Sequence, residues 1–295
     1  MGTVRYFSIT SGKGLEKAET LPEILRVRQG DGFIWLDCMD PSREELTALG
    51  AALGLHPLAI EDCLDDDQVP KIEEFPNHTF ILFNRYRHVD GAAAVDEVNF
   101  FLGEKFLVSV HSHGRGEDAL AVRLESTVRR DLDQARGGAD FLLEVILDDI
   151  VDEKFAAVEA LQDQLDTAEE EILQGRADFK PAKLMHLRRN LLALRKSLVY
   201  EREILVKMCR RDSPFITEKA IYEFRDIYDH LAKFFELTET YRDILTSLME
   251  LNMSMLNNLM TRTANVTNST VRRLTFITTI FMPLTLLAGI GGMSE

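Results

Sequence analysis

Twenty consecutive residues near the C-terminus, Leu274–Met293, carry no charged side chain, and they constrain the chain more than any other feature. A helix needs about 20 apolar residues to cross the hydrocarbon core of a bilayer. A buried helix of a soluble protein rarely needs that length without a charge. The segment therefore predicts a transmembrane helix. Arg272 and Arg273, which precede it directly, place the rest of the chain in the cytoplasm.

A helical pattern leads into this segment without a break. Apolar residues recur at a spacing of three and four from Phe224 to Leu259, and neither Gly nor Pro interrupts the pattern before Pro283. We therefore expect one continuous helix from about Glu218 to Gly289. At about 1.5 Å per residue it would be on the order of 100 Å long. Such a helix forms either a coiled-coil seam or a stalk that carries a cytoplasmic domain to the membrane.

Opposite charges separate along the preceding residues. Residues 140–180 contain thirteen acidic side chains against three basic ones, a net charge of −10, whereas residues 181–211 contain nine basic side chains against Glu201 and Glu203, a net charge of +7. Two helices of opposite charge, joined near Gly175, would pair as an antiparallel hairpin. Two thirds of the formal charge of −15 therefore lies on one helix, whose glutamate run we interpret as a solvated face.

Strand signals are confined to the N-terminal part. Short runs rich in β-branched and aromatic residues, bounded by turn residues, predict strands at 33–36, 79–83, 98–102 and 105–110. Helices are expected between them, because Ser42 has Glu45 at the capping-box position and Pro57 suits a first helical turn. We expect a mixed α/β domain with some antiparallel sheet.

The chain as a whole is therefore predicted to have an α+β fold: a mixed α/β domain, then a helical hairpin, then a very long stalk helix that continues into a transmembrane helix. The expected parts are a cytoplasmic domain (1–138), an acidic and basic hairpin (139–213), a stalk helix (214–273), a transmembrane helix (274–293) and the first residues beyond it (294–295).

Composition excludes several classes of function. The chain is acidic, with a pI near 5.0, so it repels phosphate backbones and nucleic acid is not an expected partner. Cations are the expected counter-species. Cys38, Cys63 and Cys209 lie far apart and match neither a disulfide framework nor a zinc knuckle. The sequence contains no phosphate loop, nucleophile motif or H-E-x-x-H motif, so an enzyme is not expected.

Small and polar side chains recur at heptad spacing along the last part of the helix. We call this set the polar stripe; it consists of Asn268, Val271, Thr275, Thr278, Met282, Thr285 and Gly289. These residues share one face of a supercoiled helix. A hydroxyl face in lipid needs water or a partner helix. The stripe alone fits two readings equally: several copies around a pore, or a packing interface whose threonines bond their own helix carbonyls.

Several acidic side chains form like-charge pairs four residues apart, which is unfavourable on a helix. Asp148 and Asp152 form one such pair, and Asp62 and Asp66 form another. A divalent cation would neutralise these pairs through the oxygen ligands it prefers. Salt bridges to the basic helix explain the pairs on the acidic helix equally well.

Specific motifs follow one another in a fixed order. They are His56–Asp62 (HPLAIED), Val69–Glu73 (VPKIE), Leu187–Asn190 (LRRN), Phe224–His230 (FRDIYDH), Thr240–Asp243 (TYRD) and Thr279–Met293 (TIFMPLTLLAGIGGM). Together they resemble the CorA family of divalent-cation channels and transporters, from about residue 31 to the end.

The resemblance implies a homopentameric funnel whose stalk helix becomes the first, pore-lining transmembrane helix. In that family a short periplasmic loop and a second transmembrane helix follow. The sequence ends at Glu295, before these elements, as expected of a truncated chain.

The resemblance also implies site residues. Regulatory Mg²⁺ sites between neighbouring cytoplasmic domains correspond to Glu61, Asp62, Asp148 and Asp226. The pore is expected to be lined by Asn268, Val271, Leu274, Thr278, Met282, Thr285 and Gly289, with Val271 and Leu274 as the hydrophobic constriction. The external mouth reads Gly292-Met293-Ser294, where the family has Gly-Met-Asn. A Ser hydroxyl accepts from a hydrated ion but reaches less far than an Asn amide, so ion preference stays open.

The expected function is passive, potential-driven transport of Mg²⁺, or of Co²⁺, through a homopentameric pore in the inner membrane, gated by cytoplasmic Mg²⁺ bound between subunits. The expected partners are other copies of the chain, membrane lipid and divalent cations. Two alternatives are a proton-coupled Zn²⁺ transporter on the same scaffold and a tail-anchored coiled-coil scaffold without transport.

Overall fold

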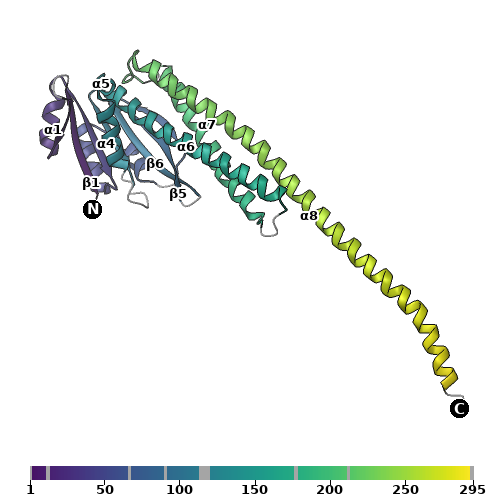
Figure 1. Cartoon of the computed structure of the whole chain (residues 1–295). Coiled ribbons are helices and arrows are strands. Elements are labelled where there is room, and N and C mark those ends of the chain that lie inside the picture. Colours follow the sequence, from purple (N-terminus) through teal and green to yellow (C-terminus); the bar gives the residue numbers. More distant parts are fainter. Residues whose placement is uncertain are drawn as a thin grey trace.

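The computed structural model describes residues 2–10, 14–65, 68–89, 92–112, 120–175, 179–210 and 213–292. Its elements are β1 (Thr3–Thr10), β2 (Gly14–Ala18), α1 (Leu21–Arg28), β3 (Phe33–Met39), α2 (Arg43–Leu53), α3 (Pro57–Leu64), β4 (Lys71–Phe75), β5 (His78–Val89), β6 (Ala92–Gly103), β7 (Phe106–His111), α4 (Leu120–Arg130), α5 (Leu132–Ala135), α6 (Ala139–Leu173), α7 (Ala182–Cys209) and α8 (Ala220–Gly292). The N-terminal elements form a mixed α/β body, from which α8 extends as a long curved rod (Figure 1).

The strands form one seven-stranded sheet in the order β2-β1-β3-β7-β6-β5-β4. Strands β3 and β7 pair in parallel, and the other described pairs are antiparallel. A parallel pair needs a crossover connection. Here the chain between β3 and β7 first forms α2 and α3 and then the β4–β5–β6 meander. Strands β3 and β7 lie next to each other in the middle of the strand order. Because they are parallel, both end at the same edge of the sheet.

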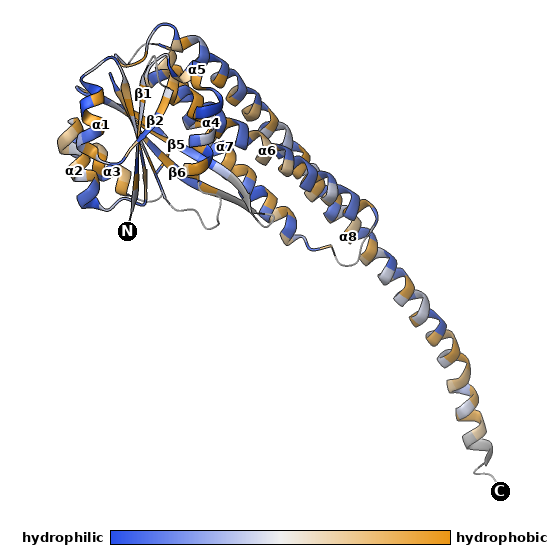
Figure 2. Cartoon of the chain, turned by 60° about the vertical axis from the view of Figure 1, so that its left-hand side comes forward, coloured by the Kyte–Doolittle hydropathy of each residue, from blue (hydrophilic) through white to orange (hydrophobic). Residues whose placement is uncertain are grey.

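Helices cover both faces of the sheet (Figure 2). Helices α1, α2 and α3 cover one face, where Ile34, Leu36 and Val108 belong to one buried cluster. Helices α4 and α6 cover the other, where Trp35 and Phe100 belong to a second cluster that continues into the contacts of α6, α7 and α8. Successive side chains of a strand point to opposite faces, so both faces of each central strand are apolar.

The predicted local signals are present in the structure. All four predicted strands form, three of them within β3, β5 and β6 and the fourth, one residue later than predicted, as β7. Ser42 and Glu45 make the reciprocal hydrogen bonds of a capping box at the start of α2, and Pro57 occupies the first turn of α3. Gly54 ends α2 in the left-handed conformation, with φ of 77°. The sequence pattern did not reveal β1, β2, β4, α1, α4 or α5.

Helices α6 and α7 run antiparallel, as the charge pattern predicted. The Nζ of Lys183 lies 2.9 Å from Glu171 Oε2 beside the connection, and the Nζ of Lys154 lies 2.9 Å from Glu201 Oε1 farther along. In both pairs the residue on α6 lies about as far before the connection as its partner on α7 lies after it, as expected of two antiparallel helices. The first pair joins an acidic residue of α6 to a basic residue of α7, as predicted. In the second pair the signs are exchanged, because the lysine belongs to the acidic helix and the glutamate to the basic one.

Helix α8 packs against both members of this hairpin in its first half. Its apolar residues at the predicted spacing are buried there as far as Leu248, and Tyr241 donates to Gln162 Oε1 of α6 at 2.9 Å. Met253 is exposed, Met255 is partly buried, and from Leu256 onward the described apolar side chains of α8 are exposed. The first half of the predicted seam is therefore core of the same chain, and only the second half is free to contact another molecule.

The long helix begins later than expected. Residues 214–219 form turns, and α8 starts at Ala220 rather than near 214–218. Asp140 holds Thr217 just before this start, because its Oδ2 accepts from the backbone N and the Oγ1 of Thr217 at 2.9 and 2.7 Å. From Ala220 the helix continues for 73 residues to Gly292. Among the described residues it is the one helix long and apolar enough to cross a membrane.

Candidate cation sites

Two predicted metal residues lie on facing helices of one chain. Asp148 of α6 lies close enough to Asp226 of α8 for the charge of Asp226 to raise the pKa of Asp148. Glu144 of α6 feels the charges of Asp148, of Glu223 on α8 and of Asp226. On α8, His230 Nε2 lies 3.9 Å from Asp226 Oδ2, one turn along. We call Glu144, Asp148, Glu223 and Asp226 the α6–α8 carboxylate cluster.

The cluster disfavours the ionised forms of its two members on α6, Glu144 and Asp148. Burial, followed by the charges of Asp148 and Glu223, raises the pKa of Glu144 to about 7, although Gln134 donates to its Oε2 at 2.7 Å. Burial and then the charge of Asp152 also raise the pKa of Asp148. A cation placed among these groups would relieve both burial and repulsion.

The other two predicted metal residues lie elsewhere in the chain. Glu61 and Asp62 are on α3, which covers the opposite face of the sheet from α6 (Figure 2). Asp62 is bound to Lys71, whose Nζ lies 2.7 Å from its Oδ2, and Glu61 is exposed. One chain therefore brings together Asp148 and Asp226 but not Glu61 and Asp62.

In the described part of the chain, no three His, Cys, Asp or Glu side chains lie close enough to enclose a metal ion by themselves. Asp226 is also largely exposed, with 72% of its side chain accessible. The α6–α8 carboxylate cluster thus supplies ligands on one side and leaves the other side open.

The described side chains of the polar stripe are exposed in a single chain. Its threonine hydroxyls donate to their own helix: Thr278 Oγ1 to Leu274 O at 2.9 Å, and Thr285 Oγ1 to Phe281 O at 2.7 Å. This satisfies the donors, while the hydroxyl oxygens keep their acceptor lone pairs. The stripe therefore presents acceptors outward.

The remaining pore positions are only partly described. Val271 and Leu274, the expected constriction, are 54% and 59% exposed on α8. Gly289 and Gly292 belong to the last turns of α8. The expected mouth residues Met293 and Ser294 lie outside the described residues.

Sequence reasoning missed three members of the neighbourhood of Asp148 and Asp226. Glu144 lies one turn before Asp148, and Glu223 and His230 flank Asp226 at three and four residues. The helical spacing of acidic residues was the available signal for Glu144, because 144, 148 and 152 lie on one face. The facing of α6 and α8 could not be read from one sequence.

Comparison with known proteins identifies the family. The family model described as "CorA-like Mg2+ transporter protein" matches residues 30–294. The cobalt/magnesium transport protein CorA of Thermotoga maritima is 31% identical over 281 residues, which cover 94% of this chain and 78% of that protein. The putative metal ion transporter YfjQ of Bacillus subtilis is 30% identical, over 92% of this chain and 82% of that protein.

The fold comparison agrees with the sequence comparison. The complete structure of the CorA magnesium transporter from Methanocaldococcus jannaschii has a TM-score of 0.75 and 25% identity, and the match covers 99% of this chain and 88% of that one. The mixed α/β domain followed by a long C-terminal helix is thus the architecture of known CorA structures. Proteins of this family are transporters and not enzymes. By its family model, its relatives and its fold, the chain belongs to the CorA-like Mg²⁺ transporter family.

Proposed function

We propose that the chain is one subunit of a homopentameric channel through which Mg²⁺, and also Co²⁺, enters the cytoplasm across the inner membrane. Residues 1–138 form its cytoplasmic domain, 139–213 the hairpin, 214–273 the stalk, and 274–293 the first transmembrane, pore-lining helix, with 294–295 starting the periplasmic loop. The observation that carries this proposal is the continuity of α8, which joins the packed cytoplasmic body to an exposed apolar segment without a break.

Exposed apolar residues support association between copies. Met253, Leu256, Leu259 and Met260 are 40% to 70% exposed on α8, between the packed part and the membrane segment. Contiguous exposed apolar surface of this kind marks an interaction site. We propose that this part of α8 packs against its equivalents around a central axis.

The polar stripe suits a hydrated cation in such a pore. Water bound to a divalent cation points its hydrogens outward and needs acceptors. The hydroxyls of Thr278 and Thr285 donate their hydrogens to carbonyls of their own helix, so they offer only acceptor lone pairs to the pore. Mg²⁺ loses its water reluctantly, so a wall of acceptors fits the ion with its hydration shell.

The driving force needs no nucleotide. A potential of 100 mV, negative inside, is worth about 2.3 kcal/mol per charge, or about 4.6 kcal/mol for a dication. Passive flow inward follows from this field.

The α6–α8 carboxylate cluster supports regulation by cytoplasmic Mg²⁺. Asp148 and Asp226 provide one side of a site, and Glu61 and Asp62 of a neighbouring copy would complete it. Bound Mg²⁺ would join the copies and hold Val271 and Leu274 together in a closed constriction. Its loss would leave repelling carboxylates and loosen the ring.

Flux into liposomes tests the transport proposal. The full-length protein is reconstituted with a Mg²⁺-sensitive dye inside and an imposed inside-negative potential. We expect Mg²⁺ entry that increases with the potential and is blocked by competing Co²⁺. Entry no faster than in protein-free liposomes, from protein shown by mass to be pentameric, would overturn the proposal. Zn²⁺ entry that requires a pH gradient would establish the proton-coupled alternative instead.

Internal Mg²⁺ tests the regulatory part. In the parent protein, loading the side of the cytoplasmic domains with Mg²⁺ is expected to suppress flux. Asp226→Asn should weaken that suppression at least tenfold in Mg²⁺ concentration. Asp229→Asn is the matched control, because Asp229 is an exposed aspartate on the same helix one turn from the cluster. Equal suppression in parent and Asp226→Asn would exclude the site.

A further inference from the structure

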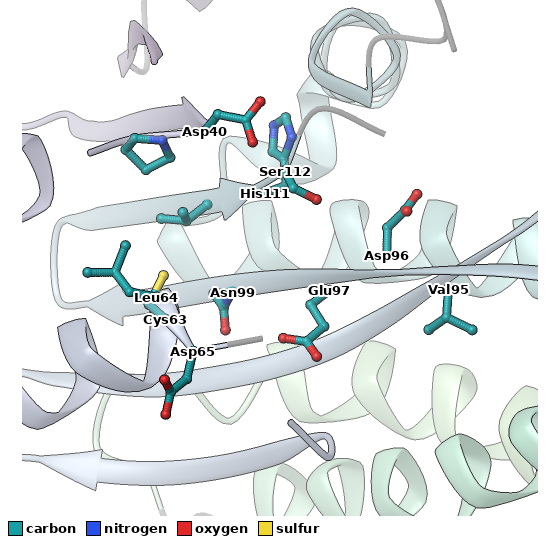
Figure 3. A pocket seen from close by; sticks show the side chains of 12 residues that line it. Asp40, Cys63, Leu64, Asp65, Val95, Asp96, Glu97, Asn99, His111 and Ser112 are labelled. Atoms are coloured by element: carbon teal, nitrogen blue, oxygen red, sulfur yellow. The ribbon is translucent and has the colours of Figure 1, made fainter. Parts of the chain in front are cut away.

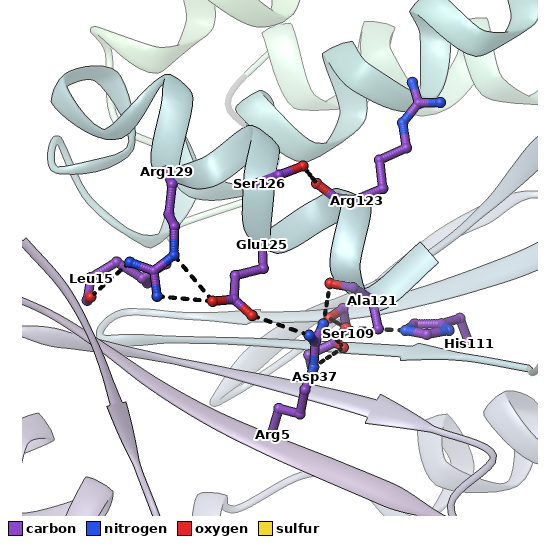
Figure 4. Close-up of polar contacts among 10 residues, drawn as sticks. All are labelled: Arg5, Leu15, Asp37, Ser109, His111, Ala121, Arg123, Glu125, Ser126 and Arg129. Atoms are coloured by element: carbon purple, nitrogen blue, oxygen red, sulfur yellow. Dashed lines mark hydrogen bonds and ion pairs between the residues drawn. The ribbon is translucent and has the colours of Figure 1, made fainter. Parts of the chain in front are cut away.

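Charged side chains around the sheet find their partners within one chain. Glu97, which lines the cavity at the ends of β3 and β7 (Figure 3), accepts from the backbone N of Gln68 at 2.9 Å. Arg5 donates to Asp37 at 2.9 Å and to Glu125 at 3.2 Å (Figure 4). Such groups are complete in a single copy. One side of α6 and one side of α7 differ from them, because their charges point away from the chain.

Helix α6 carries exposed acidic side chains at a spacing of three and four. We call them the acidic flank: Glu159, Asp163, Asp166 and Glu170. The ion pairs that α6 makes in the described part of the chain use other residues, namely Asp149, Glu153, Lys154 and Glu171. The acidic flank is therefore left for solvent or for another molecule.

Helix α7 carries an exposed side of the opposite charge. We call it the basic flank: Met185, Arg189, Leu192, Lys196 and Val199. Its three apolar members are 45%, 47% and 42% exposed and lie seven residues apart, so they form one line along the helix. Arg189 and Lys196 each follow a member of that line by four residues. An exposed apolar line bordered by charges is the surface that one helix presents to another, and the charges select the partner.

The two flanks point away from the contact between α6 and α7. The buried pair of Lys154 and Glu201 marks that contact. Glu159 follows Lys154 by five residues, and Lys196 precedes Glu201 by five. At about 3.6 residues per turn, each lies about 140° around its helix from the contact.

Both flanks border α8. Burial and then the charges of Asp166, Glu159 and Asp163 raise the pKa of Tyr241 on α8. On α7, Arg195 directly precedes Lys196 and pairs with Glu239 of α8. Since α8 packs on both helices of the hairpin, it separates the two flanks. One copy thus has an acidic side and a basic side, with α8 between them.

The flanks also match in level along the hairpin. The pair of Lys154 and Glu201 shows which residues of the two helices are level. Counting five residues from it on each helix reaches Glu159 and Lys196, and counting twelve reaches Asp166 and Arg189. A rotation about an axis parallel to the helices keeps every residue at its level. In a ring of copies, the acidic side chains of one copy are therefore level with the basic side chains of the next.

We propose that neighbouring copies bind head to tail through these surfaces, with the acidic flank of one copy against the basic flank of the next. Glu159 then pairs with Lys196, and Asp166 with Arg189. The inference rests on the ring of the proposed function and adds a contact to it. An interface between two different surfaces joins each copy to two neighbours, as a closed ring requires. At the next level Asp152 and Glu203 carry the same charge, so the contact ends there.

Cross-linking of the full-length protein in liposomes tests this contact. Glu170→Cys with Met185→Cys puts one thiol on each flank at the same level and leaves the two proposed ion pairs intact. Glu170→Cys with Val199→Cys is the matched control, because its thiols are fourteen residues out of level, or about 21 Å at about 1.5 Å per residue. A short bis-maleimide joins thiols that are close, and a denaturing gel separates the products. Single-cysteine variants report any product formed through Cys38, Cys63 or Cys209.

We expect the level pair to react at least tenfold faster than the control pair and to give a ladder that reaches the mass of the whole ring. Glu159→Lys added to the level pair should slow cross-linking at least fivefold, and so should Lys196→Glu. The two reversals together should restore the rate to within twofold, because the charges are again opposite.

Three results would overturn the proposal. They are equal rates in the level and control pairs, products that stop at the dimer, and charge reversals whose effects add instead of cancelling. Native mass separates this failure from that of the proposed function. A pentameric mass with any of these results removes only this contact, whereas a monomeric mass removes the ring as well.

Discussion

Lys154 of α6 and Glu201 of α7 form an ion pair at 2.9 Å in which both side chains are completely buried. Each residue has the minority charge of its own helix. The pair lies against β5, because Lys154 Nζ also donates to the Asn84 carbonyl and Glu201 Oε1 accepts from the Asn84 backbone N. Two of the charges that break the acidic and basic pattern are thus each other's partners, and they join the hairpin to the sheet.

Removing one member of this pair should destabilise the protein strongly. We expect Lys154→Met to lower the free energy of unfolding by about 3–5 kcal/mol, since it leaves the Glu201 charge buried and unpaired. Lys154→Met combined with Glu201→Leu should recover most of that loss. Urea unfolding followed by Trp35 fluorescence measures both. A double variant as unstable as the sum of the single variants would contradict the prediction.

Glu144 should make stability depend on pH near neutrality. Its pKa is raised to about 7 in the folded chain from an ordinary value of 4.5. The folded state therefore holds the proton more tightly, and stability should fall as the pH rises from about 4.5 through 7. One pKa unit is worth about 1.36 kcal/mol, so the loss reaches at most about 3 kcal/mol.

Glu144→Gln tests this prediction, because its amide oxygen can still accept from Gln134. We expect the variant to be more stable than the parent at pH 8 and equal to it near pH 4, by urea unfolding. Glu170→Gln, at an exposed position on the same helix, is the control and should not change the pH profile. An unchanged slope in Glu144→Gln would assign the pH dependence to other groups.

Asp140 should control where α8 begins. It is 3% exposed and accepts two hydrogen bonds from Thr217. Hydrogen bonds to a charged group are worth about 1.5–3 kcal/mol each, so Asp140→Ala should cost about 3 kcal/mol or more. Hydrogen exchange should then accelerate at residues 217–221. Thr217→Val, which keeps the backbone bond, should cost about half as much.

Removing a hydroxyl of the polar stripe should lower the flux of Mg²⁺. Thr278→Val removes an acceptor from the stripe, and we expect Mg²⁺ flux to fall about two- to tenfold, the equivalent of a hydrogen bond of 0.5–1.5 kcal/mol. Thr279→Val is the matched control. Thr279 makes the same bond to its own helix, from Oγ1 to Thr275 O at 2.7 Å, but does not belong to the stripe. Equal losses in the two variants would point to helix damage rather than to the pore.

Strands with uniform apolar character were predictable, and those with mixed character were not. β7 is buried along its whole length and was found by composition alone. β1 carries Arg5 in its middle, which obscures the strand pattern, and only the fold shows that this charge is matched by Asp37 of the neighbouring strand.

The candidate sites could be predicted from the sequence only in part, because they combine residues that are distant along the chain. The helical face containing Glu144 and Asp148 follows from spacing, and Asp226 came from a motif. Their approach to one another depends on how α8 lies on α6, which no local pattern encodes.

The uninterrupted course of α8 makes it a mechanical lever. Asp226 and Val271 are separated by 45 residues of one helix, or about 68 Å at about 1.5 Å per residue. A tilt of about 1° at the level of Asp226 then moves Val271 by about 1 Å, since displacement grows in proportion to that length. A change of about 1° in how the first half of α8 packs on α6 and α7 is thereby amplified to about 1 Å at the start of the apolar segment.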